Sequence, residues 1–143
     1  MRPSRNPASE GSGPEGAEPR AARAAKAQCP CGLGGPYDEC CGRFHQGGNA
    51  PTAELLMRSR YAAFAVGDRK YLLRTWHSTT KPRRLTLDDT EWTGLEIVDR
   101  DKGGLFDKEG VVEFNARHAG GVLHERSRFV REDGKWVYLD AAG

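Results

Sequence analysis

Four cysteines in one short stretch are the residues of this chain best suited to chemistry. Cys29, Cys31, Cys40 and Cys41 lie in the segment CPCGLGGPYDECCGRFH, and the rest of the sequence contains no other cysteine. Four thiolates can bind one Zn²⁺ in a tetrahedral site. The residues between the two pairs include three glycines and a proline, which allow the chain to turn back sharply and bring the pairs together.

Two other chemistries compete with zinc at this segment. A zinc knuckle usually has about two to four residues between paired cysteines, whereas the pairs here have one and none. Disulfides rarely persist in a reducing cytoplasm, and a bond between the adjacent Cys40 and Cys41 would be strained. A redox dithiol usually has Cys-x-x-Cys spacing, which is absent. The residues alone favour zinc without excluding the other two.

Composition and charge indicate a soluble, cytoplasmic chain. No run approaches the roughly 20 apolar residues of a membrane span, and the N-terminus lacks the apolar core of a signal peptide. Residues 1–27 are rich in Gly, Pro, Ala, Glu and Ser, which predicts a disordered tail. Beyond them 17 basic and 17 acidic side chains cancel. We therefore expect no membrane partner and no broad nucleic-acid footprint, while a local basic patch remains open.

Two helices should follow the cysteine segment. Thr52 is the predicted N-cap of a helix that runs to residue 66, where Gly67 can end it, and Asp68 can cap a second helix over 69–76. The first helix is apolar on nearly every side, so we expect it to be buried. Its Arg58 and Arg60 then cannot both lie free in solvent. At least one needs a carboxylate or carbonyl partner, unless both extend along the surface to water.

Four strand-like segments separated by turn signals follow the helices. They cover residues 92–101, 110–118, 122–132 and 135–140. Asp133-Gly134 predicts a hairpin turn of the primed type, and Gly120-Gly121 predicts a second turn. Helices followed by hairpin-linked strands indicate an α+β fold with an antiparallel sheet.

The two turns predict the strand registers. They pair Val130 with Val137, Phe129 with Tyr138, Ser127 with Asp140, Phe114 with Ser127, Val112 with Phe129 and Glu113 with Arg128. One face of the sheet then carries the aromatic residues and should meet the helices. The other face is polar, with Glu113 and Arg128 as a cross-strand ion pair.

The aromatic face also carries polar side chains that need partners. The residues expected in this candidate pocket are Arg58, Arg60, Trp76, His77, Glu125, Ser127 and Asp140. A histidine beside two carboxylates would supply acid–base chemistry. In the structural alternative, an arginine of the first helix pairs with Glu125 or Asp140 and fastens the helix to the sheet. Nothing like a nucleophile elbow surrounds Ser127, which argues against a nucleophilic role.

The string CPCGLGGPYDECCG resembles the SEC-C motif, in which Cys-x-Cys is followed after eight residues by Cys-Cys or Cys-His. That motif occurs at the end of the bacterial translocase motor SecA and in many small bacterial proteins. The resemblance implies one Zn²⁺ bound by Cys29, Cys31, Cys40 and Cys41. Four thiolates leave no open position, so this zinc would be structural. His45 is a spare ligand candidate that we expect at the surface.

Two longer segments, PTAELLMRSRYAAFAVGDRKYLLRTWH and HERSRFVREDGKWVYLDA, are similar to the YchJ-like bacterial proteins. The resemblance implies a zinc loop at 28–46 and a domain at 50–142 like nuclear transport factor 2 (NTF2-like). Such a domain has a curved antiparallel sheet around helices, often forming a cone with a pocket. Members often carry a second, C-terminal SEC-C motif, which this sequence does not show. We therefore expect a function that needs one such motif.

The loop and the cone suggest different functions. The loop would present Leu33, Tyr37, Arg43 and Phe44 on a rigid surface, and in SecA the similar motif contacts other macromolecules. We expect a binding or adaptor module with a protein or ribosome partner, rather than an enzyme. The alternative is a small-ligand binder or enzyme that uses the polar cluster in the cone. Because the apolar residues expected in the core all lie beyond the linker QGGNA, we also expect residues 50–143 to fold without the loop.

Overall fold

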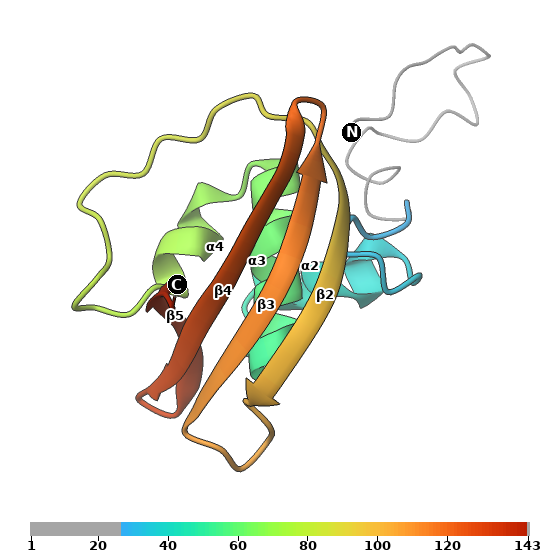
Figure 1. The fold of residues 1–143 in the computed structure, drawn as a ribbon. Coiled ribbons are helices and arrows are strands. Elements are labelled where there is room, and N and C mark those ends of the chain that lie inside the picture. The colour runs from blue at the N-terminus through green and yellow to red at the C-terminus, as the bar shows by residue number, and fades with distance from the viewer. Residues whose placement is uncertain (1–26, 143) are drawn as a thin grey trace, which may run out of the picture.

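The computed structural model describes residues 27–142, in which short helices precede one antiparallel sheet. The predicted tail at 1–27 therefore lies outside the described residues except for Ala27. The elements are η1 (Tyr37–Glu39), α2 (Cys41–His45), α3 (Ala53–Val66), α4 (Arg69–Arg74), β2 (Trp92–Lys102), β3 (Glu109–His118), β4 (Gly121–Glu132) and β5 (Lys135–Ala141). The strand order is β2-β3-β4-β5 (Figure 1).

Helices α3 and α4 begin and end where the sequence indicates. The Thr52 side chain accepts a hydrogen bond of 3.1 Å from the backbone N–H of Leu55. Gly67 ends α3 in the left-handed conformation, with φ 82°. Asp68 then caps α4 by accepting from the N–H of Tyr71. The second helix stops at residue 74 rather than 76, because Trp76 forms an isolated parallel bridge with Tyr138 of β5.

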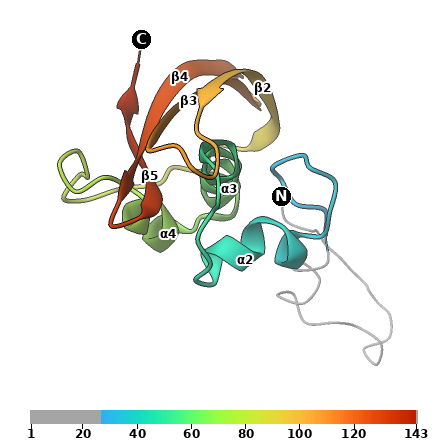
Figure 2. The same ribbon diagram turned by 90° about the horizontal axis from the view of Figure 1, so that it is seen from below.

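The core lies between α3 and the concave side of the sheet, as Figure 2 shows. Its fully buried side chains include Leu56 from α3, Tyr71 and Leu72 from α4, and Val112 and Phe129 from the sheet. The predicted aromatic face is therefore the core face. This arrangement confirms the expected α+β fold with a curved antiparallel sheet around a helix.

The β4–β5 hairpin follows the predicted turn but contains a bulge. Asp133 and Gly134 both have positive φ, at 55° and 80°, and Val130 pairs with Val137 as expected. A register shift between Arg128 and Phe129 then places Asp140 opposite Arg128 instead of Ser127. The prediction that Asp140 lies on the core face is wrong, because the extra residue turns it to the outer face.

The β3–β4 register differs from the prediction by two residues. The turn consists of Ala119 and Gly120, with His118 paired to Gly121, so that Phe114 faces Glu125 and Val112 faces Ser127. Because side chains alternate with a period of two, this slip changes the partners without exchanging the faces.

The outer face of the sheet carries a set of ion pairs that follows the observed registers. The predicted Glu113–Arg128 pair does not form; Glu113 contacts Arg126 at 3.0 Å, and Arg128 makes two 2.6 Å hydrogen bonds to Asp140. Residues 75–91 connect α4 to β2 as an irregular segment that passes beside α4 (Figure 1). Among residues 27–142, no helix is both long enough and apolar enough to cross a membrane.

Candidate metal centre

The four cysteines converge on one point beside α3. Cys29 and Cys31 lie in the loop before η1, Cys40 follows η1 and Cys41 begins α2. All four are buried free thiols, and their Sγ atoms lie within 4.8 Å of one another. The Cys31 and Cys40 sulfurs are 3.5 Å apart. In a tetrahedral site with Zn–S bonds of about 2.3 Å, neighbouring sulfurs would lie about 3.8 Å apart, so this arrangement fits a single ion.

Backbone geometry closes the loop around the cysteines. Gly32 and Gly34 adopt φ values of 88° and 101°, which L side chains rarely adopt. The N–H of Cys29 donates to the carbonyl of Gly35 at 2.9 Å, which closes the turn before the second cysteine pair. A Cβ at Gly42 would lie 2.7 Å from the carbonyl oxygen of Tyr37, so only glycine fits the start of α2.

The thiols strongly perturb one another. Side-chain hydrogen bonds from Cys31 and Cys41 lower the pKa of Cys29 to about 2. The same hydrogen bond to Cys29 raises the pKa of Cys31 to about 12, and contacts with Cys29 and Cys31 also raise the pKa of Cys41. Among these protein groups alone, the lowered pKa favours the thiolate at Cys29, and the raised pKa values favour the thiols at Cys31 and Cys41. A dication is the kind of group that would allow all four to ionise together.

Helix α3 supports the cysteine cluster directly. Ala62 is fully buried among the four sulfurs, where a larger side chain would intrude. Arg58 donates from Nη1 to the carbonyl of Cys31 at 2.7 Å and from Nε to Glu54 at 2.9 Å. Arg58 therefore ties the loop to α3 and does not reach the sheet.

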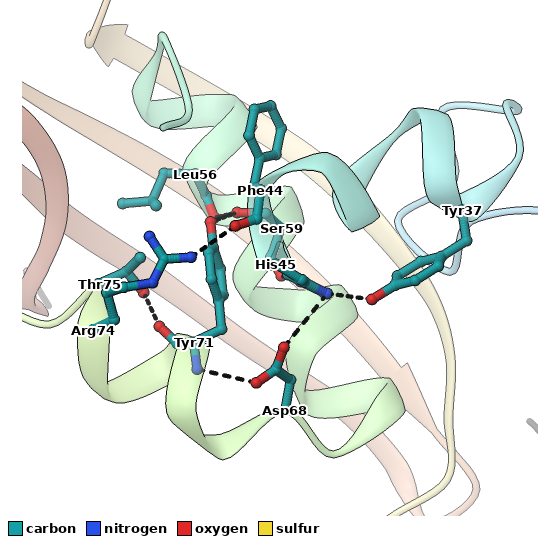
Figure 3. Close-up of polar contacts among 9 residues, drawn as sticks. All are labelled: Tyr37, Phe44, His45, Leu56, Ser59, Asp68, Tyr71, Arg74 and Thr75. Atoms are coloured by element: carbon teal, nitrogen blue, oxygen red, sulfur yellow. Dashed lines mark hydrogen bonds and ion pairs between the residues drawn. The ribbon is translucent and has the colours of Figure 1, made fainter. Parts of the chain in front are cut away.

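His45 joins α2 to the helical body, as Figure 3 shows. Its Nε2 lies 2.9 Å from the carbonyl of Ser59, and its Nδ1 lies 2.5 Å from the hydroxyl of Tyr37. The neutral tautomer that carries its proton on Nε2 satisfies both contacts, with Tyr37 as the second donor. The His45 side chain is only 3% exposed. The expectation that His45 lies at the surface is wrong, and its ring nitrogens are occupied by protein groups rather than aimed at the sulfurs.

Phe44 and Tyr37 also face inward, contrary to the surface predicted for the loop. Phe44 is 6% exposed and belongs to the main core, and Tyr37 packs against the cysteine cluster. Arg74 of α4 donates to the carbonyl of Phe44 at 2.7 Å (Figure 3). The premise that all core residues follow the linker is therefore wrong. Leu33 and Arg43 remain exposed, as expected.

These attachments were not predicted from the sequence. The contact of His45 with Ser59 joins residues 14 apart, and that of Arg74 with Phe44 joins residues 30 apart. The polar side chain of Ser59 is no signal for the first, because His45 contacts the backbone carbonyl of that residue, whereas the Ser59 hydroxyl bonds to Leu56 and Tyr71.

The candidate pocket divides into separate groups. Arg60 is 4% exposed, and its Nη1 donates to the carbonyls of Leu72 and Thr75 and to the Thr75 hydroxyl, rather than to a carboxylate. Its guanidinium lies 4.9 Å from the ring centroid of Trp76 and 4.8 Å from that of Tyr138. Burial lowers the pKa of Arg60 to about 10, so the side chain stays charged at neutral pH.

The acidic members of the pocket lie in different places. Glu125 accepts hydrogen bonds from Ser127 at 2.7 Å and Tyr138 at 3.0 Å on the core face. Asp140 pairs with Arg128 on the outer face. His77 lies 3.8 Å from Glu132, near Ser78, instead of beside Glu125. The predicted direct pair between an arginine of α3 and Glu125 or Asp140 does not form.

These features define a class of protein: an NTF2-like domain preceded by a SEC-C-type loop of four cysteines. A family model described as "YchJ, middle NTF2-like domain" matches residues 52–141, and the chain belongs to this YchJ-like family. It is 60% identical over 114 residues to UPF0225 protein SCO1677 of Streptomyces coelicolor, covering 78% of this chain and 92% of that protein. It is 53% identical over 116 residues to UPF0225 protein CE1570 of Corynebacterium efficiens, covering 78% and 89%.

Solved structures show the same combination. RPA3114 of Rhodopseudomonas palustris, a SEC-C motif containing protein, matches with a TM-score of 0.68 and 32% identity, over 82% of this chain and 98% of that one. A SEC-C motif containing protein of Psychrobacter arcticus matches with a TM-score of 0.68 and 29% identity, over 82% and 83%. The fold and the cysteine motif predicted from the resemblance are thus confirmed.

Proposed function

We propose that the chain is a zinc-stabilised binding module whose cysteine loop presents a rigid surface to a protein or ribosome partner. The observation that carries this proposal is the convergence of four buried Sγ atoms within 4.8 Å. Sulfur-only tetrahedral sites suit Zn²⁺, and four thiolates would fill its coordination sphere. Cys29, Cys31, Cys40 and Cys41 would hold the ion, which would then act structurally. The proposal includes a cytoplasmic location, where thiols stay reduced.

The surface that such a site would support includes Leu33. This side chain is 51% exposed at the tip of the loop, between two glycines whose backbone is fixed by the turn. An apolar side chain held at a rigid tip can bind a partner with little loss of conformational entropy. The single zinc would act by fixing that tip.

Affinity capture with matched variants tests the adaptor role. The bait is the full chain, purified under reducing conditions with zinc present, either as wild type or as Leu33→Asp. Val122→Asp is the control, because Val122 is 52% exposed but lies on β4, two strands from β2, the strand that Gly32 of the loop approaches. We expect specific partners that Leu33→Asp loses and Val122→Asp retains. The same partners on all three baits would contradict a role for the loop tip.

A small-ligand site in the cone is a second candidate function, and one observation favours it. The indole Nε1 of Trp76 is buried and has no hydrogen-bond partner among residues 27–142. It belongs to the group formed with Arg60 and Tyr138, and a ligand with an acceptor atom would satisfy it. The enzyme form of this alternative is weaker, because His77 and Asp140 lie with other partners.

A thermal-shift screen of small carboxylates and amides tests this second function. A ligand that binds there should raise the melting temperature of the wild type but not that of Trp76→Phe, which removes the free donor while keeping an aromatic ring. Equal shifts in both proteins would place the binding elsewhere.

A further inference from the structure

The charges of the described chain are distributed unevenly. Residues 69–87, which cover α4 and most of the segment before β2, contain six basic side chains and no acidic one. The other residues from 27 to 142 contain 11 basic and 17 acidic side chains. A chain that is nearly neutral overall therefore has one strongly positive region.

The basic side chains of this region are exposed and lack acidic partners. Arg69, Lys70, Arg74, Arg83 and Arg84, here called the basic surface, are all exposed. None of them forms an ion pair within the described residues. Of the nearby carboxylates, Asp68 caps α4, Asp88 accepts from the N–H of Thr90, and Glu132 of β4 accepts from the N–H of Ser78.

Contacts within the region bring its members together. Arg69 reaches the carbonyl of Leu85, which places the start of α4 beside Arg83 and Arg84. Lys70 and Arg74 lie four residues apart on one side of α4. Figure 1 shows the segment between α4 and β2 passing around the same side of the molecule.

The outer face of the sheet provides the contrast. Its arginines each contact a carboxylate: Arg117 contacts Glu96, Arg126 contacts Asp99 and Glu113, and Arg128 contacts Asp140. Those charges are neutralised within the protein, whereas the charges of the basic surface are available to an outside anion.

We propose that the basic surface binds the phosphodiester backbone of nucleic acid. Arginine, which supplies four of its five members, presents a planar set of donors that matches phosphate oxygens. Residues 69–87 expose no large apolar side chain, so this surface lacks the apolar centre expected of a protein–protein interface. Phosphate contacts need charge and donors alone, and they act without reading sequence. Arg74 also donates to the carbonyl of Phe44 in the cysteine segment, whereas the other four members make no hydrogen bond to that segment within residues 27–142. The proposal therefore does not rest on the zinc-module function.

The test is fluorescence anisotropy with a labelled 20-nucleotide oligo(U) RNA and an oligo(dT) DNA of roughly equal length, titrated with the zinc-loaded full chain. Because the phosphate is common to both, we expect similar affinities for RNA and DNA. The logarithm of the binding constant should fall linearly with the logarithm of salt concentration, with a slope of about −0.7 for each phosphate contact.

Matched variants locate the contacts. Arg83→Gln/Arg84→Gln removes two charges from the basic surface, and Lys108→Gln/Lys135→Gln removes two from elsewhere. All four side chains are exposed and make no hydrogen bond or ion pair within residues 27–142, so both variants should fold normally. We expect the first variant to bind about tenfold more weakly and its salt slope to fall by about 1.4, with little change in the second.

Two results would overturn the proposal. Equal losses in the two variants would show that binding follows net charge rather than this surface. Displacement of the RNA by poly-L-glutamate at an equal concentration of negative charge would indicate an acidic protein as the partner instead.

Discussion

The cysteine loop and the group formed by Arg60, Trp76 and Tyr138 are both buried and polar, but they differ in the partners available to their polar atoms. Arg60 is a cation whose Nη1 donates to three acceptors near the end of α4, while two aromatic rings flank the guanidinium. The cysteines are four acids of one kind that face one another. A polar group satisfied by its own fold indicates a structural role, whereas a set of like ligands around one point indicates a bound ion. By this criterion the cysteine cluster is the candidate site, and Arg60 belongs to the structural framework.

The first way to test this comparison is to remove the loop. A chain that begins at residue 50 lacks Phe44 of the main core and His45, whose ring centroid lies 4.6 Å from that of Tyr71. We expect this fragment to lose cooperative folding, with collapse of its near-ultraviolet circular dichroism and a broad urea transition. A fragment with a sharp transition would show that the loop is an appendage.

Arg60→Met should have the next largest effect. It removes the charged donor shared by the Leu72 carbonyl and by the Thr75 carbonyl and hydroxyl in a buried site, although the Thr75 carbonyl keeps the N–H of Tyr138. We expect a cost of about 2–4 kcal/mol in the free energy of unfolding. Arg58→Met is the matched control and should cost less, about 1–2 kcal/mol, because Glu54 keeps Arg100 as a partner and only the Cys31 carbonyl loses its donor.

A double-mutant cycle of Arg60→Met with Glu125→Gln sharpens this result. The two side chains form no ion pair among the described residues, and Glu125 has its own donors, Ser127 and Tyr138. Urea unfolding should give a coupling energy below about 1 kcal/mol. A coupling energy of about 2 kcal/mol or more would instead support the direct Arg60–Glu125 pair expected from the sequence.

His45→Phe tests the link between the loop and the helices. It keeps the aromatic packing on Tyr71 but leaves the Ser59 carbonyl and the Tyr37 hydroxyl without this partner. We expect a loss of about 1–3 kcal/mol, measured by urea unfolding, and a smaller loss for Tyr37→Phe, which removes one of the two hydrogen bonds. Equal stability of His45→Phe and wild type would mean that packing alone joins the loop to α3.

A smaller effect should come from acid titration of Glu54, which lies between Arg58 and Arg100. Burial raises the pKa of Glu54, but the hydrogen bonds from the two arginines lower it by a larger amount. The net pKa therefore lies below the ordinary value of 4.5. The stabilisation is therefore complete above the unfolded pKa and is lost as pH falls through the folded pKa. We expect the urea midpoint of wild type to fall below about pH 4.5, and that of Glu54→Gln to fall less. If the urea midpoints of the two proteins fell in parallel with pH, Glu54 would not contribute to the acid sensitivity.

Local signals in the sequence were sufficient for much of the fold. Thr52, Gly67 and Asp68 mark helix ends through their own backbone contacts, and Asp133-Gly134 marks a hairpin by its left-handed conformation. The cysteine cluster was equally predictable, because all four ligand candidates lie within one short loop.

The remaining features depend on long-range contacts that the sequence does not express locally. The bulge at Arg128 carries no distinctive residue, yet it moves Asp140 to the outer face. Gly120 and Gly121 both suit a turn, and the choice between them set the β3–β4 register. The inward position of His45 depends on a carbonyl of α3 that becomes available only when the loop packs against that helix.

Metal content measured on the full chain tests the central claim most directly. Protein purified under reducing conditions without chelators should contain about one zinc per chain by elemental analysis, and native mass spectrometry should show the same stoichiometry. Cys31→Ser should lose most of the metal, while Ser127→Ala, which changes a buried residue outside the cluster, should retain it. Wild-type protein that contains no zinc and two disulfides among Cys29, Cys31, Cys40 and Cys41 would contradict the account.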